Sequence, residues 1–111
     1  MREIMYAHTR CLYDFYHNLD RPDEVLRLVE FAPQFQHLFE QAKAGGGPIL
    51  FVTPHTSNFD LAGRAMALRG LSFQVLSYPQ PPKGYQLQNR IRQESGLEMT
   101  PMSVASVQQA R

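Results

Sequence analysis

The sequence predicts an α/β fold in which N-terminal helices precede a partial parallel β-α-β layer. Through roughly the first forty residues apolar side chains recur at helical spacing, and beyond a glycine-rich stretch short apolar runs alternate with further helical stretches. Such alternation is typical of a parallel sheet with right-handed crossovers. The length of 111 residues and the hydrophobic content of 43% suit one modest domain or a part of a larger one.

Residues 1–44 are predicted to be a helical leader. Apolar residues recur at helical spacing from Arg2 to Asn18. The acidic segment that follows signals the start of a second helix, with Asp20 as its cap. Pro33 interrupts the pattern, which then resumes and continues to Lys43. The leader therefore consists of helices with short breaks between them.

Residues 48–111 are predicted to continue as alternating strands and helices. The stretch Gly45-Gly46-Gly47-Pro48 ends the leader and lacks the spacing of the glycine motifs that bind phosphate. Three strands with an unfinished last helix leave an uncovered edge, so we expect an N-terminal fragment, truncated at its C-terminus, of a longer domain. The predicted strands are 49–53, 71–76 and 97–99, and the predicted helices are 58–69, 85–94 and one that begins at Ser103.

Composition and spacing argue against several classes of function. The formal charge of +1 provides no broad field for nucleic acid, and no apolar run approaches the roughly 18 to 20 residues that span a bilayer. The single Cys11 cannot form an internal disulfide and stands in no recognisable relation to a catalytic partner. His8, His17 and His37 lack metal-ligand spacing, so no metal centre is predicted.

The segment FVTPHTSNFDLAG carries the main candidate site. His55 follows a predicted strand, in the position where open parallel sheets bind ligands. Asp60 is placed to fix the tautomer of this imidazole, which would then act as a general base on a hydroxyl. A structural reading is also available, since Ser57 to Asp60 fits the S-x-x-D capping box that begins a helix. The spacing alone leaves both readings open.

The segment ILFVTPHTSNFDLAG resembles the H-x-x-x-x-D block of the lysophospholipid acyltransferase superfamily. Specifically, it resembles the branch of bacterial lipid A biosynthesis (lauroyl/myristoyl) acyltransferases and related glycolipid acyltransferases. A later stretch, NRIRQESGLEMTPM, is similar to the R-x-x-x-G element of that branch, matched here by Arg92 and Gly96. The helical leader also suits the family, so the resemblance covers nearly the whole chain. It implies a fold of the glycerolipid acyltransferase type, of which this chain holds the first catalytic half.

The resemblance implies transfer of a fatty acyl group from an acyl-carrier-protein or coenzyme A thioester to a hydroxyl of a lipid A precursor or a related glycolipid or lysolipid. His55 is the implied general base, and Asp60 orients it. No cofactor or metal is implied, because the thioester is a substrate. Asn58, Arg92 and Arg90 are the implied substrate-binding residues, with Arg92 as the first candidate to hold an acceptor phosphate. The isolated chain is expected to be inactive.

The family also implies a location at the cytoplasmic face of the bacterial inner membrane, where the protein is peripheral or anchored by a segment absent from this sequence. The competing interpretation is a noncatalytic membrane- or partner-binding module, in which Asp60 only caps a helix. The ordered occurrence of the strand, the H-x-x-x-x-D block and the R-x-x-x-G element favours the enzyme, because a binding module does not require all three.

Overall fold

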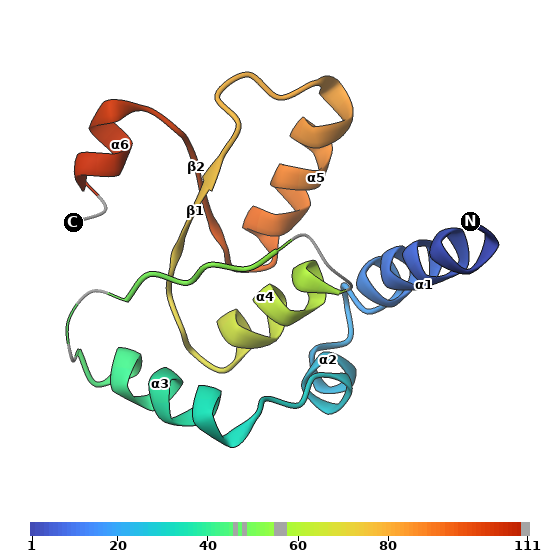
Figure 1. Ribbon diagram of the computed structural model, residues 1–111, viewed down its shortest axis with the longest axis horizontal. Helices are drawn as coiled ribbons and strands as arrows, with labels where there is room; N and C mark the ends of the chain where they lie inside the picture. Colours follow the sequence, from blue (N-terminus) through green and yellow to red (C-terminus); the bar gives the residue numbers. More distant parts are fainter. Residues whose placement is uncertain (46, 48, 55–57, 110–111) are drawn as a thin grey trace.

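The computed structural model describes residues 1–45, 47, 49–54 and 58–109 (Figure 1). It confirms the α/β class, because helices come first and a parallel β-α-β unit follows them. In Figure 1 the sheet lies near the middle of the fold, with α5 beside it and α3 and α4 below it. The elements in chain order are α1 (Arg2–His17), α2 (Pro22–Leu28), α3 (Pro33–Lys43), α4 (Phe59–Leu68), β1 (Gln74–Ser77), α5 (Lys83–Glu94), β2 (Glu98–Pro101) and α6 (Val104–Gln109).

The leader forms the helices that the sequence predicts, with one difference at a helix start. Pro22 occupies the first turn of α2, where its missing N–H costs nothing, and two acidic residues follow it. The predicted cap Asp20 is not the N-cap of α2, because that position is held by Arg21 without a side-chain hydrogen bond. The proline therefore sets the start of this helix, and the acids complement its dipole.

The sheet consists of two parallel strands. β1 and β2 pair in a register that runs from Gln74 opposite Glu98 to Ser77 opposite Pro101. The predicted strands at 71–76 and 97–99 are thus present, each displaced toward its C-terminus. Leu71 and Leu97 are buried just before the paired segments. They are apolar because they pack in the interior, and they take no part in the strand pairing.

The strand predicted over residues 49–53 is wrong, because residues 49–54 form neither strand nor helix. Phe51 is the one side chain of this run that packs among aromatic rings, with ring centroids 5.8 Å from Phe35 and 6.4 Å from Phe73. Leu50 and Val52, on either side of it, are 87% and 85% exposed. A strand inside a parallel sheet requires cover on both faces, and this segment is covered on one. The layer described here therefore holds two strands rather than three.

Helix α4 packs on α2 through a small apolar core. Val25 of α2 meets Leu61 and Ala65 of α4, and all three side chains are buried. Arg69, just after α4, donates from Nη2 to the carbonyl oxygens of Leu26 (3.3 Å) and Val29 (2.9 Å) at the end of α2. Carbonyl oxygens at the C-terminal end of a helix generally lack an intrahelical donor, and here the guanidinium donates to two of them. The leader is thereby fixed against the helix that bears Asp60.

A buried arginine ties α4 to two other parts of the chain. Arg64 donates from Nη1 to Ser95 Oγ (2.7 Å) at the end of α5, and from Nη2 to the carbonyl oxygen of Leu19 after α1. Burial lowers the pKa of the Arg64 guanidinium below its usual value, and the charge of Asp20 opposes part of that shift. The two hydrogen bonds offset the cost of burying a charge and hold α5 close to α4.

Gly96 permits a close approach between the end of α5 and α4. Its φ is +96°, a left-handed conformation in which a side chain is strained. A Cβ atom at this position would also lie 3.2 Å from the Cβ of Ala67. Two features therefore require a glycine at this position of the R-x-x-x-G element: the positive φ of the turn that ends α5, and the close contact with α4.

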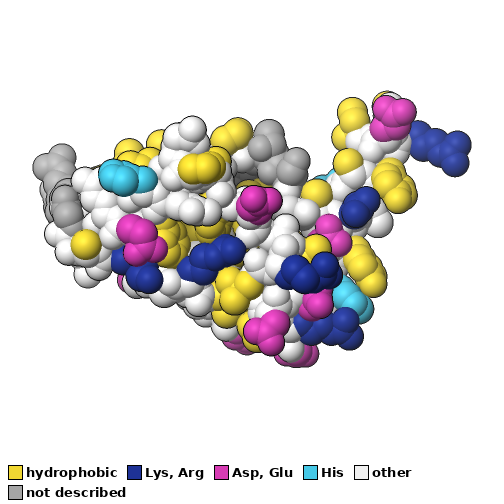
Figure 2. Space-filling model, turned by 90° about the horizontal axis from the view of Figure 1, so that it is seen from below, with side chains coloured by type: hydrophobic (Ala, Val, Ile, Leu, Met, Phe, Trp, Pro, Cys, Tyr) yellow, Lys and Arg dark blue, Asp and Glu magenta, His cyan; other side chains and the backbone are white. Residues whose placement is uncertain are grey.

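The N-terminal part of α1 stands away from the rest of the fold (Figures 1 and 2). Residues 1–10 are all exposed, and hydrophobic side chains cover much of this projecting helix in Figure 2. The C-terminal end of the helix docks through the buried side chains of Phe15 and of Asn18, its C-cap residue. Among the described residues, no helix combines the length and the apolar character needed to cross a membrane.

We predict that Gly96→Ala destabilises the protein by about 1–2 kcal/mol or more, because alanine is strained at positive φ and its methyl group presses on Ala67. Gly84→Ala in α5 is the matched control, since a Cβ there meets nothing within 4 Å. That change should be neutral or stabilise by up to about 1 kcal/mol, because alanine is a better helix former. Urea unfolding midpoints of the two variants check the prediction. Equal stability of both variants would contradict it.

Candidate functional site

The site predicted from the sequence falls partly outside the described residues. His55, the candidate general base, and Ser57 lie in the segment 55–57, which the structure does not describe. The described part of the block begins at Asn58, which is the N-cap residue of α4. The site is therefore built here from Asn58, Asp60 and the residues around them.

Asp60 lies in the first turn of α4, one residue after the helix begins at Phe59. Its Oδ1 accepts a hydrogen bond from Arg92 Nε at 2.6 Å, and its Oδ2 accepts from Arg92 Nη2 at 3.2 Å and from Gln88 Nε2 at 3.3 Å. Within the described part of the chain, its hydrogen bonds thus come from α5 and not from backbone N–H groups of α4. This arrangement joins two helices, whereas a helix-capping side chain would bind only backbone N–H groups of its own helix.

The Asp60–Arg92 ion pair is largely withdrawn from water, because each side chain is 13% exposed. Two parallel N–H···O contacts between a guanidinium and a carboxylate fix both groups in direction as well as distance. The position of Asp60 also suits a negative charge, since the first turn of a helix carries the positive end of its dipole. The pair is a rigid, charged contact between α4 and α5.

Arg92 is engaged at all three of its guanidinium nitrogens. Nε and Nη2 bind Asp60, and Nη1 donates to Asn89 Oδ1 at 3.1 Å. Its guanidinium carbon also lies 5.5 Å from the centroid of the Phe59 ring. The sequence interpretation gave Arg92 an acceptor phosphate as its partner, and the structure gives it Asp60. Arg90, on the same helix, is exposed.

The helical spacing of α5 explains why these residues converge. Gln88 and Arg92 are four positions apart, so both side chains lie on one face of the helix and reach the same carboxylate. The sequence analysis did not identify Gln88 or Asn89. Their positions three and four residues before Arg92 could have identified them, because residues at that spacing lie on the same face of a helix.

Asn58 connects the block to α1. Its Nδ2 donates to Asp14 Oδ2 at 3.3 Å, while its Oδ1 is buried and has no hydrogen-bond partner among the residues that the structure describes. Asp14 was not identified from the sequence, where nothing distinguishes it from any other acid on a helix. Helix α4 therefore has two carboxylates near its N-terminus, one from α1 and one of its own.

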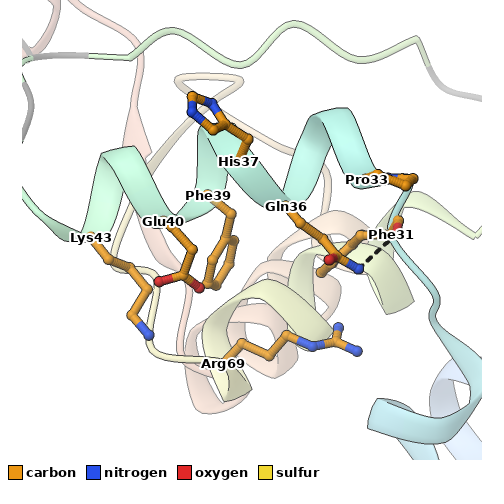
Figure 3. Close-up of a pocket in the computed structure, with 8 residues that line it drawn as sticks. All are labelled: Phe31, Pro33, Gln36, His37, Phe39, Glu40, Lys43 and Arg69. Atoms are coloured by element: carbon orange, nitrogen blue, oxygen red, sulfur yellow. Dashed lines mark hydrogen bonds between the residues drawn. The ribbon is translucent and has the colours of Figure 1, made fainter.

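A separate cavity of about 620 Å³ lies between α3 and the far end of α4 (Figure 3). Arg69 and Lys43 both face it in Figure 3, beside the rings of Phe31 and Phe39. Asp60 and Arg69 are about 13 Å apart along the axis of α4, at roughly 1.5 Å per residue. The cavity is thus distinct from the Asp60 site. It is lined by Phe31, Pro33, Gln36, His37, Phe39, Glu40, Lys43 and Arg69.

No group of three or more potential metal ligands occurs among the residues that the structure describes. The described site offers a carboxylate held by a guanidinium, three side-chain amides and the N-terminus of a helix. These groups can orient a neighbouring base and stabilise negative charge.

Comparison with known proteins identifies the family. Residues 20–109 match the family model described as bacterial lipid A biosynthesis acyltransferase. No curated protein and no solved structure matches the chain. Acyltransferases of this family use acyl-carrier-protein or coenzyme A thioesters as substrates without a bound cofactor, and they are associated with the bacterial inner membrane. Because the match extends over residues 20–109 of a chain of 111, the chain belongs to the bacterial lipid A biosynthesis acyltransferase family.

Proposed function

We propose that this chain carries the catalytic dyad of an O-acyltransferase, with His55 as the general base and Asp60 as the residue that orients it. The enzyme moves a fatty acyl group from an acyl-carrier-protein or coenzyme A thioester to a hydroxyl of a lipid A precursor or a related glycolipid or lysolipid. The observation that carries the proposal is the ion pair between Asp60 and Arg92, because it joins the two family motifs in one place.

The reaction needs a base because a hydroxyl with a pKa far above 7 is a poor nucleophile. In the proposed mechanism His55 takes the hydroxyl proton while the oxygen attacks the thioester carbonyl carbon. The tetrahedral intermediate then expels the thiolate, which takes the proton back from the imidazolium. The products are an ester and a free thiol, so atoms and charge balance without a cofactor.

Asp60 is equipped to hold an imidazole. A carboxylate has about four lone-pair sites, and the contacts from Arg92 and Gln88 occupy three of them. The remaining site is available for a ring N–H, which would fix the tautomer and stabilise the imidazolium. Since Arg92 fixes the carboxylate through two nitrogens, it would act as a positioning residue for Asp60.

Further groups of the described site suit the other demands of acyl transfer. The oxyanion of the tetrahedral intermediate needs stabilising, and the N-terminus of α4, a helix of ten residues, carries the positive end of the helix dipole. We further propose that Asn58 contributes to substrate binding and that Arg90, exposed on α5, binds a phosphate of the acceptor. The active site would then face the cytoplasmic surface of the inner membrane, where donor and acceptor meet.

The direct test of the function is thiol release from an acyl thioester by the full-length protein, with lipid and glycolipid acceptors. His55→Ala should lower kcat by about 10² or more, because the acceptor hydroxyl loses its base. His8→Ala, a change at an exposed histidine of α1, is the matched control and should leave kcat unaltered. Full activity of His55→Ala in a folded protein would contradict the proposal and favour a noncatalytic binding module.

The ion pair can be tested separately with Asp60→Asn, Arg92→Gln and the double variant. Each single change leaves one buried charge without its partner, so each should cost up to about 3–5 kcal/mol of stability. The double variant should lose less than the sum of the two, because no uncompensated charge remains. Its activity should nevertheless stay at least about 10² below wild type, since Asn cannot stabilise an imidazolium.

Chemical denaturation and kcat, measured on the same four proteins, separate the two roles of Asp60. Recovery of stability without recovery of kcat is the expected result for an acid that serves both the fold and the reaction. A double variant that regains wild-type kcat would show that Asp60 serves only to pair Arg92.

The role of Arg90 predicts a change in substrate binding alone. Arg90→Ala should raise KM for a phosphate-bearing acceptor by about tenfold, because one charge-assisted contact is lost, while kcat and melting temperature stay the same. Lys83→Ala, at an exposed cation on the same helix, is the control for a nonspecific loss of charge. An unchanged KM for Arg90→Ala, or an equal change in both variants, would remove Arg90 from the site.

A further inference from the structure

Asp14 of α1 is placed to determine how the side chain of Asn58 is oriented. Asp14 Oδ2 lies 3.3 Å from Asn58 Nδ2, although the two residues are 44 positions apart in the sequence. An ionised carboxylate can only accept hydrogen bonds, so the NH₂ group of the amide must be the end that faces it. The carbonyl oxygen of Asn58 must then point the opposite way.

The other end of the same amide is unusual. Asn58 Oδ1 is buried, and no residue in the described part of the chain forms a hydrogen bond with it. A buried acceptor without a donor costs free energy, so an amide that was free to rotate would not settle in this orientation without a reason. The contact with Asp14 supplies that reason, because the alternative orientation would set Asn58 Oδ1 against a carboxylate.

Asp14 is itself held in place by the docked end of α1. Its side chain is 24% exposed, and its backbone carbonyl accepts a hydrogen bond from Asn18 Nδ2 at 2.7 Å. Phe15 and Asn18, on the same turn, are buried against the body of the protein. The neighbouring Arg10 Nε lies 4.0 Å from Asp14 Oδ2, and since its side chain is 71% exposed it contributes little.

From this geometry we propose that Asp14 is a positioning residue for the acyl-transfer reaction, acting by fixing the amide orientation of Asn58. The inference rests on the proposed function, because Asn58 is the N-cap of the helix that carries Asp60. The helical leader thereby contributes to the active site: one of its carboxylates sets an acceptor oxygen two residues from Asp60. Neither family motif contains Asp14.

A swap of the two side chains tests this role in the full-length enzyme. Asn58→Asp places two carboxylates against each other, and kcat should fall by about tenfold or more, as is typical when an outer positioning contact is lost. Asp14→Asn combined with Asn58→Asp restores the hydrogen bond with its polarity reversed, and it again leaves an acceptor oxygen at position 58. This double variant keeps the net charge of wild type, and its kcat should return to within about threefold.

Asp23→Asn is the control for the loss of an acid, since Asp23 is exposed in the first turn of α2. Its kcat should equal that of wild type. An active Asn58→Asp enzyme would overturn the proposal, and so would a double variant that folds stably yet stays as slow as Asn58→Asp.

A second measurement does not depend on activity. In ¹⁵N-labelled protein the side-chain NH₂ protons of Asn58 should exchange slowly with water. Asp14→Ala should accelerate that exchange by about tenfold or more, because the hydrogen bond from Asn58 Nδ2 to Asp14 is lost. Unchanged exchange would overturn the role of Asp14. If instead wild type and His55→Ala are equally inactive while the exchange changes as expected, the proposed function fails and the contact between Asp14 and Asn58 stands.

Discussion

The ion pair between Asp60 and Arg92 is the contact on which the rest of the site depends. It joins the first turn of α4 to α5 through a 2.6 Å contact between two side chains that are each 13% exposed. A buried ion pair contributes little net stability, because both charges lose their hydration. Its value is in specificity: any other packing of α4 on α5 would leave a carboxylate or a guanidinium buried alone. The carboxylate of Asp60, which helps to select this packing, is also the group that we propose to orient the catalytic base.

The sequence predicted the local structure of this chain well where one short pattern decided the outcome. The acidic segment after α1 marked the start of α2 to within one residue, and the apolar runs near Val75 and Met99 became the two paired strands. The prediction of a strand at 49–53 was wrong, because a strand of this composition needs other elements packed on both of its faces. Leu50 and Val52 have the composition of a buried strand but remain in contact with solvent. Periodicity reports which side chains are apolar, and not whether a second layer is there to meet them.

The sequence singled out Asp60 and Arg92 as candidate site residues, but it did not reveal that they pair. Asp60 was expected to orient His55, and Arg92 was expected to bind an acceptor phosphate. The separation of 32 residues gave no hint that they meet, because contact across two helices depends on the crossing of those helices. Asp14 was beyond prediction for the same reason. His55 lies outside the described residues, so its relation to Asp60 stays a prediction.

The long-range contacts made by α4 and by Arg69 just after it also constrain the order in which the chain can fold. Arg64 and Arg69 bind carbonyl oxygens at Leu19 and Leu26, 45 and 43 positions earlier, and Asp60 binds a partner 32 positions later. Contacts of such long sequence separation form slowly, because a large loop must close before any of them is gained. During synthesis the leader and α4 therefore emerge well before α5 is available. The carboxylate of Asp60 therefore has no ion-pair partner from α5 until the ribosome has released Arg92.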